Sequence, residues 1–222
     1  MIRGTNSEAL SRRLIYIPII HSQVDMGALR ESVRRATLQK LGQMGWKRKV
    51  NLIDAGWTEI EKVIDGLALC FEKARLYQDG LPVCGREAEI VTELAKAGSR
   101  NHQLLLRLME RGAMIMGTES SELLVEEYEV VKQNLAARDT LKAAGVAAGK
   151  KALSDSLLKR RDQYIAERIN GTLRAGETGI LFLGMLHSLG NWLDRDIRVI
   201  YPITRPPGDK EDDRKRQACP DR

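Results

Sequence analysis

The sequence predicts an α/β domain, with a central, mostly parallel sheet of about five strands covered by helices. Three observations lead to this fold class. Five short apolar stretches are typical of buried strands. Four of them are followed by amphipathic helical segments, and this alternation favours a mostly parallel sheet covered by helices. The longest unbroken apolar runs, residues 14–20 and 179–186, are far too short to cross a bilayer.

The five predicted strands are short and rich in aliphatic side chains. The first also has features of a signal peptide, because basic residues precede it. It contains Pro18, however, and continues into His21 without a small-residue cleavage site, so a strand is the better interpretation. The strands are expected at residues 14–20, 74–77, 113–116, 180–183 and 197–203.

Apolar side chains at helical spacing predict the helices between the strands. Ser99 is expected to cap one helix and Ser154 the last one, which should end near Leu173. Residues 135–151 are rich in Ala and Lys, which is compatible with a continued helix, but they contain two glycines, and we interpret them as a break or a lid-like connection. The helices before this stretch are expected at residues 26–41, 53–67, 87–97, 100–112 and 121–134.

The length and composition of the chain limit how many domains it can form and which kinds of partner it can bind. Of the 222 residues, 1–204 are expected to form a single domain, and the proline-containing, charged segment 205–222 a disordered tail. The net charge of +6 would suit nucleic acid, but basic and acidic residues are interleaved and aromatics reach only 5%, which favours a solvated surface. Three cysteines without a CxxC pair indicate a reducing, cytoplasmic location. No membrane partner is expected, and the oligomeric state stays open.

Polar residues stand where four of the predicted strands end. His21 follows the first strand, Asp79 the second and Glu119 the third, while the fourth continues through Gly184 to His187. In open parallel sheets, ligands bind beyond the carboxyl ends of the strands. We therefore expect two imidazoles and two carboxylates at one edge of the sheet. Such a set can bind a divalent metal, or orient and deprotonate a water molecule.

Each of these residues also has a purely structural interpretation. Asp79 precedes a glycine in a common turn pair, and a carboxylate at Glu119 favours the start of a helix. Two of the chain's three histidines at equivalent positions nevertheless favour a joint site. The third, His102, is expected at the surface, and Cys84 is expected to be a small buried residue.

The last predicted helix carries charges on its apolar face. Asp162 falls within a stripe of four aliphatic side chains between residues 158 and 173, and Arg161 lies at its edge. A charge on a packed face is costly unless it is paired. Two interpretations have equal support. Either Arg161 reaches the site to hold a carboxylate or a substrate oxyanion, or it snorkels to solvent while Asp162 makes a local hydrogen bond.

These motifs resemble those of the TraB/PrgY and Tiki families, within the wider erythromycin-esterase and ChaN-like superfamily. The resemblance spans residues 14–203, and its most similar block runs from residue 161 to residue 199. The chain has Pro18 where the families have glycine, and an aspartate where glutamate is usual. The matching motifs, in chain order, are His21, Asp79, Gly117-Thr118-Glu119, Arg161-Asp162 and Gly184-Met185-Leu186-His187.

The resemblance implies an α/β fold with an active site made from the strand ends. The Tiki branch has divalent-metal-dependent peptidase activity, and erythromycin esterases use a histidine to activate water. The ChaN branch binds haem, and the TraB/PrgY branch is linked to peptide-pheromone control. Carried over, His21 and His187 would match the GxxH histidines. Asp79 and Glu119 would match the acidic positions, and Arg161 the helix arginine.

The leading hypothesis is a hydrolase that acts on a small molecule or a peptide. His21, Glu119 and His187 would bind a divalent ion such as Mn, Co, Zn or Fe, or polarise a water molecule directly. Asp79 would orient one imidazole or complete the ligand set, and Arg161 would stabilise developing negative charge. The alternative is a non-catalytic or regulatory protein that holds haem or a peptide in the same pocket.

Overall fold

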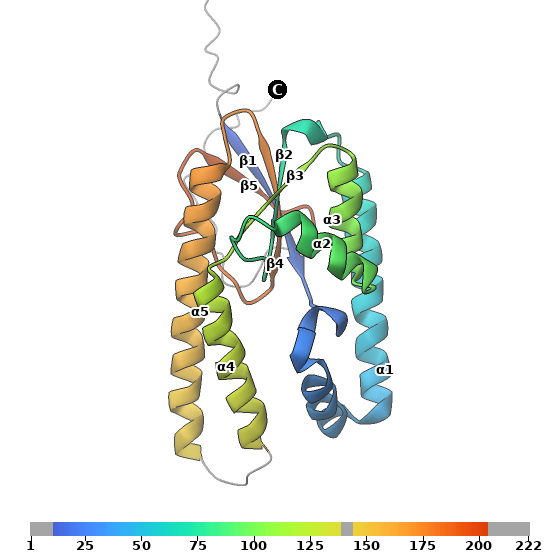
Figure 1. Ribbon diagram of the computed structural model, residues 1–222, viewed down its shortest axis with the longest axis vertical. Coiled ribbons are helices and arrows are strands. Elements are labelled where there is room, and N and C mark those ends of the chain that lie inside the picture. Colours follow the sequence, from blue (N-terminus) through green and yellow to red (C-terminus); the bar gives the residue numbers. More distant parts are fainter. Residues whose placement is uncertain (1–10, 139–143, 204–222) are drawn as a thin grey trace, which may run out of the picture.

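The computed structural model describes residues 11–138 and 144–203, in which five parallel strands form one sheet in the order β3-β2-β4-β1-β5 (Figure 1). The predicted α/β class and all five predicted strands are confirmed, and no strand end differs from its prediction by more than three residues. The strands are β1 (Arg12–Ile19), β2 (Ala74–Gln78), β3 (Met114–Met116), β4 (Thr178–Gly184) and β5 (Ile197–Ile200).

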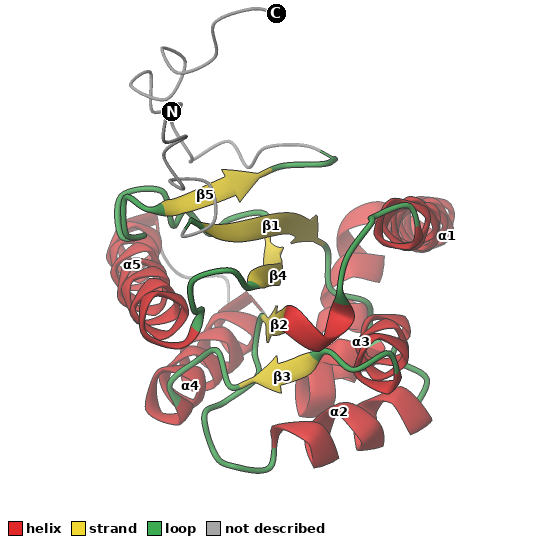
Figure 2. Cartoon of the chain, turned by 90° about the horizontal axis from the view of Figure 1, so that it is seen from above, coloured by secondary structure: helices red, strands yellow, loops and turns green. Residues whose placement is uncertain are grey.

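Helices cover both faces of this sheet (Figure 2). Successive side chains of a strand point to opposite faces. In β1, Ile15 and Ile17 therefore pack toward one helical layer, while Leu14 and Tyr16 pack toward the other. The first layer consists of α1 (Arg30–Asp65), α2 (Glu87–Lys96) and α3 (Arg100–Glu110), and the second of α4 (Ser121–Arg138) and α5 (Ala144–Thr172).

The second layer contacts the sheet through one stripe of α5. Ile165, Ile169 and Leu173 are buried against the strands, at the helical spacing that the sequence predicts. Helix α4 packs beside α5, and the two extend together beyond the carboxyl edge of the sheet (Figure 1). The charged residues of α5 that lie next to this stripe are thereby held at the sheet edge.

Helix α1 consists of two helical parts that meet at Gly42. This residue has φ 66° and ψ 178°, which are not helical angles and suit a residue without a Cβ. The break agrees with the prediction of two successive helices in this region. Only the second part enters the core, through Trp57, Ile60 and Ile64. The first part follows the short 3-10 helix η2 (Val24–Leu29) and has no buried side chain.

Two predictions for the second half of the chain are wrong. Residues 135–138 belong to α4 and residues 144–151 to α5, so only residues 139–143, which lie outside the described part, remain as a connection. Ser154 lies inside α5 and does not cap it. The high helix propensity of alanine and lysine outweighs the cost of the two glycines. The predicted tail, residues 205–222, also lies outside the described residues.

Among the described residues, no helix combines the length and the apolar character that a membrane span requires.

Candidate functional site

The strand order places the four predicted positions side by side. Strands β3, β2, β4 and β1 are consecutive in the sheet. In the same order, their carboxyl ends lead to Glu119, Asp79, His187 and His21. Residues that are far apart in the chain therefore meet at one edge of the sheet, which was the central expectation from the sequence.

Asp79 is the centre of this cluster, and both imidazoles face one of its oxygens. Its Oδ2 accepts a hydrogen bond from His21 Nε2 at 2.9 Å, and His187 Nε2 lies 3.8 Å from the same oxygen. The backbone N–H of Gly184 also donates to Oδ2, at 2.9 Å. The other oxygen, Oδ1, accepts from Arg161 Nη2 at 2.9 Å. The side chain of Asp79 is only 5% exposed, so its charge is satisfied by these partners.

Gly184 makes the close approach of Asp79 possible. A Cβ at this position would lie 2.8 Å from Asp79 Oδ2 and 3.5 Å from His187 Cδ2. Any side chain would therefore push the carboxylate away from the two histidines. The N–H of His187 donates to the carbonyl of Gly184 at 3.1 Å, and this turn directs the imidazole back toward the sheet edge. A residue without a side chain is therefore required three positions before His187, because a Cβ there would collide with Asp79.

Glu119 and Arg161 form a buried bidentate ion pair beside Asp79. Arg161 donates from Nε to Glu119 Oε2 at 2.6 Å and from Nη2 to Oε1 at 2.7 Å. Glu119 Oε1 also accepts from the backbone N–H of Gly80 at 2.7 Å. The third nitrogen of Arg161, Nη1, pairs with Glu127 on α4. One guanidinium thus bridges the ends of β2 and β3 and ties them to both helices of the second layer.

This geometry decides between the two interpretations of Arg161. The side chain is 4% exposed and holds carboxylates, so the snorkelling interpretation is wrong. Each of its three nitrogens is already bonded to Asp79, Glu119 or Glu127. Arg161 is therefore a positioning residue, and its nitrogens are not free to hold a substrate oxyanion.

Asp162 holds the second imidazole and was not among the predicted site residues. His187 Nδ1 donates to Asp162 Oδ1 at 2.5 Å, and the backbone N–H of Ser188 donates to Oδ2 at 3.1 Å. The expected local hydrogen bond of Asp162 is thus replaced by a contact across 25 positions of the chain. The signal was present in the sequence, because an acid within an apolar stripe requires a buried partner.

The carboxylates favour the protonated form of both histidines. Burial disfavours a charged imidazole, but the hydrogen bond and charge of Asp79 outweigh this and raise the pKa of His21 above its ordinary value. Burial also disfavours a charged imidazole at His187, but Asp162 and Asp79 outweigh it and raise the pKa of His187 above its ordinary value. Burial also opposes the ionisation of Asp79, yet His21, His187 and Arg161 hold the pKa of that carboxyl well below its usual range.

The predicted metal ligands do not fit a metal ion. Both oxygens of Glu119 are bonded to Arg161, and His21 Nε2 is bonded to Asp79. The guanidinium of Arg161 therefore already pairs with Glu119, the one carboxylate of the predicted metal ligands. Within residues 11–138 and 144–203, no three His, Cys, Asp or Glu side chains are grouped in a way that would hold a metal.

His102 belongs to a separate network and is buried, which corrects the expectation of surface exposure. Its Nδ1 donates to Ser99 Oγ at 2.7 Å, and Ser99 Oγ donates to Asp25 Oδ1 at 2.5 Å. Burial opposes the charge of Asp25, but these groups and Ser22 lower the pKa of Asp25 to about 2. The predicted N-cap at Ser99 is confirmed. Cys84, expected to be buried, is exposed.

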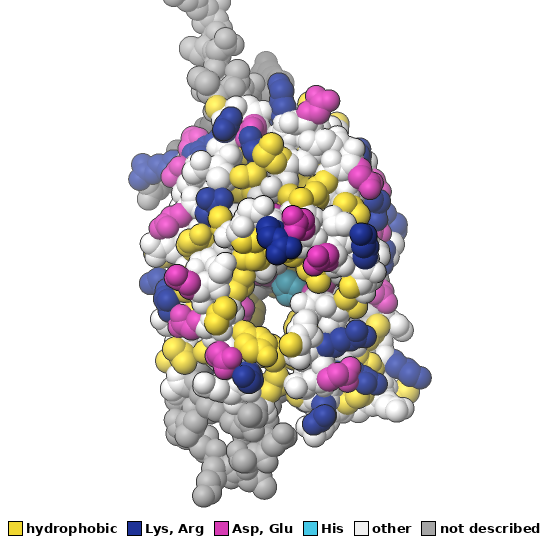
Figure 3. Space-filling view, in the orientation of Figure 1, with side chains coloured by type: hydrophobic (Ala, Val, Ile, Leu, Met, Phe, Trp, Pro, Cys, Tyr) yellow, Lys and Arg dark blue, Asp and Glu magenta, His cyan; other side chains and the backbone are white. Residues whose placement is uncertain are grey.

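The sheet edge opens into a hollow of the molecular surface. Figure 3 shows this opening in the lower half of the molecule, with a histidine side chain at its upper margin and hydrophobic side chains beside it. Of the two histidines that face Asp79, His21 has a side chain that is 29% exposed, and that of His187 is 5% exposed. A molecule that enters from solvent therefore meets His21 first.

Comparison of the chain with known protein families, with curated proteins and with solved structures gives no match. The resemblance to the TraB/PrgY and Tiki families stays a prediction from short motifs.

Proposed function

We propose that this protein is a hydrolase of a small molecule or a peptide, in which His21 is the general base and Asp79 holds it in place. One observation carries the proposal. His21 binds Asp79 through Nε2, while the same side chain lines a cavity. A carboxylate only accepts hydrogen bonds, so Nε2 carries the proton and Nδ1 is the nitrogen that can accept one. In the described part of the chain, Nδ1 has no hydrogen-bond partner.

The reaction follows from this arrangement. A water molecule gives a proton to His21 Nδ1 while its oxygen forms a bond to the substrate's carbonyl carbon. The bond between that carbon and the leaving oxygen or nitrogen then breaks, and the leaving group takes the proton from the imidazolium. Asp79 stabilises the imidazolium as it forms. His187, fixed by Asp162, is a positioning residue on the other side of Asp79. No step uses a metal, because the expected ligands do not fit one.

The surroundings of His21 favour a substrate with an apolar part. The cavity that His21 lines is bordered by large apolar side chains, among them Trp46, Ile53 and Trp57. Large apolar side chains beside a polar site are typical of ligand-binding pockets. The resemblance to hydrolytic families points to the same reaction class.

Esterase activity tests this proposal with the substrate p-nitrophenyl octanoate. We expect the native chain to hydrolyse this ester and EDTA to leave the rate unchanged. In His21→Gln, the rate should fall by about a hundredfold or more, as for the removal of a general base. A cooperative thermal unfolding transition of the variant would show that it is folded. Equal rates of the folded variant and the native chain would reject the role of His21. Loss of activity in EDTA would restore the metal hypothesis.

A non-catalytic binding protein is the second candidate, and the raised pKa of His21 favours it. An imidazolium cannot accept a proton, but it binds an anion. The haem form of this alternative has less support, because His21 Nε2 is already bonded to Asp79. Binding of a ligand in the cavity without turnover of any ester or amide would support this candidate over the hydrolase.

A further inference from the structure

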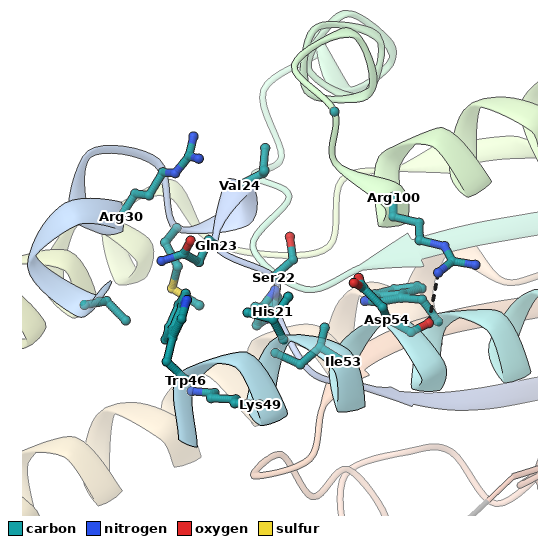
Figure 4. A pocket seen from close by; sticks show the side chains of 15 residues that line it. His21, Ser22, Gln23, Val24, Arg30, Trp46, Lys49, Ile53, Asp54 and Arg100 are labelled. Carbon is teal, nitrogen blue, oxygen red and sulfur yellow. Dashed lines mark hydrogen bonds between the residues drawn. The ribbon is translucent and has the colours of Figure 1, made fainter. Parts of the chain in front are cut away.

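A cavity of about 250 Å³ lies beside His21, between the segment after β1 and the two parts of α1. It extends away from Asp79, so His21 connects the polar cluster to this space. Figure 4 shows the side chains around it, with His21 between the Trp46 side and the Arg100 side. Its lining is mainly apolar, and the apolar side chains are Val24, Met26, Val33, Trp46, Val50, Ile53 and Trp57.

The polar groups of the cavity are unevenly paired. Arg100 is bound to Glu61 and to the backbone carbonyl of Asp54. Arg30 and Lys49 also line the cavity, and neither has an ion-pair partner within the described residues. Gln23 also lines the cavity, and its Nε2 is buried without a hydrogen-bond partner in the described part of the chain. Two cations without an ion-pair partner among the described residues, and one acidic residue, Asp54, therefore border an apolar space, so positive charge is in excess around it.

We propose that this cavity binds a small apolar carboxylate. The apolar body would lie against Trp46 and Trp57, and the carboxylate would pair with Arg30 or with Lys49, which lie on opposite sides of Trp46 (Figure 4). The volume corresponds to roughly eight water molecules at about 30 Å³ each, which suits a ligand of about ten non-hydrogen atoms. A cationic ligand would face Arg30 and Lys49 and is disfavoured.

The inference names the substrate class of the proposed hydrolase and in that respect rests on it. The scissile ester or amide would lie at His21, with the apolar, negatively charged part of the substrate in the cavity. Binding itself does not require catalysis. The cavity can therefore be tested in a variant that lacks the proposed base geometry.

Tryptophan fluorescence measures binding directly, because Trp46 and Trp57 line the cavity and the third tryptophan, Trp192, does not. The probes are octanoate, octan-1-ol and octylamine, which share one chain length and differ in charge. We expect saturable octanoate binding by the native chain and by Asp79→Asn, and weaker binding of octylamine. Replacing Arg30 and Lys49 together by Gln should weaken octanoate binding by about tenfold or more, the loss expected for charged hydrogen-bond partners, and leave octan-1-ol unchanged.

The matched control replaces Arg34 and Lys47, neighbours outside the cavity, by Gln and should leave octanoate binding unchanged. Absence of saturable binding, equal binding of octylamine, or an equal loss in the control would overturn the inference. Octanoate binding without turnover of any ester would instead reject the proposed function and leave the cavity assignment intact. Turnover of p-nitrophenyl octanoate without octanoate binding would reject the cavity assignment alone.

Discussion

Arg161 and Asp162 are neighbours on α5, and each binds a different half of the candidate site. Arg161 holds the carboxylates of Asp79 and Glu119, while Asp162 holds the imidazole of His187. Two successive residues of one helix thus fix the ends of three strands. Arg161 is positive and binds carboxylates, while Asp162 is negative and binds an imidazole. Together the two residues add no net charge to this part of the helix.

Removing the charge of Asp79 should greatly reduce activity. In Asp79→Asn, the carboxylate that orients His21 and stabilises its imidazolium is lost, and we expect ester hydrolysis to fall by about a hundredfold or more. Steady-state rates with p-nitrophenyl octanoate measure the effect. The matched control is Asp155→Asn, an exposed position on the same helix as Arg161, which should retain the native rate. Native activity in Asp79→Asn would show that His21 does not depend on this carboxylate.

Activity and stability should respond to pH in opposite directions. The pKa of His21 is raised above 6.5, so the neutral base becomes available only as the pH rises through that higher pKa, and the rate should increase there. The same raised pKa stabilises the fold below the ordinary value, and this contribution is lost as the pH rises through the folded-state pKa. Rates and urea midpoints between about pH 6 and pH 9 test both trends. A rate that falls over this range would contradict the assignment of a neutral base.

A side chain at residue 184 should separate Asp79 from the histidines. In Gly184→Ala, the added Cβ would lie 2.8 Å from Asp79 Oδ2. We expect a loss of about 1–3 kcal/mol in the free energy of unfolding, as for other overpacked positions, together with loss of activity. Chemical denaturation measures the first and ester hydrolysis the second. Gly171→Ala, a position on α5 with no atom near the new Cβ, is the control and should not lower either value.

Loss of the buried guanidinium should cost much more than loss of its exposed neighbour. Arg161→Met leaves Asp79 and Glu119 without their cation, and breaking a buried pair in this way costs about 3–5 kcal/mol. Arg160 forms an exposed pair with Glu126, and Arg160→Met should change the free energy of unfolding by about 1 kcal/mol or less. Urea titrations of the two variants give both values. If both variants lose a similar amount of unfolding free energy, the buried ion pairs of Arg161 do not stabilise the fold more than an exposed pair does.

The strands and the polar residues after them could be predicted from the sequence because both signals are local. An aliphatic run such as the one that forms β4 predicts a strand without any knowledge of its neighbours. Parallel pairing then carries His21, Asp79, Glu119 and His187 to a common edge. Their mutual order in the sheet needed no separate prediction, since any parallel arrangement brings the carboxyl ends to the same side.

The partners of these residues could not be predicted in the same way. Which acid faces which imidazole depends on how α5 crosses the sheet, and the sequence left Arg161 and Asp162 with two equal interpretations. The metal hypothesis assumed that Glu119 is free, but the bidentate contact with Arg161 is a tertiary feature. His102 was expected at the surface because it lies at the start of a helix, and its partner Asp25, 77 positions earlier in the chain, could not be recognised from the sequence.

His21 and His187 both face Asp79, and an NMR titration of the histidine ring signals is the sharpest test of this arrangement. With only three histidines in the chain, each signal can be assigned by single substitution. In the native chain we predict pKa values of both residues above 6.5, and in Asp79→Asn a decrease of both. If the substitution leaves the pKa of either histidine unchanged, the two rings do not share this carboxylate and the proposed site is contradicted.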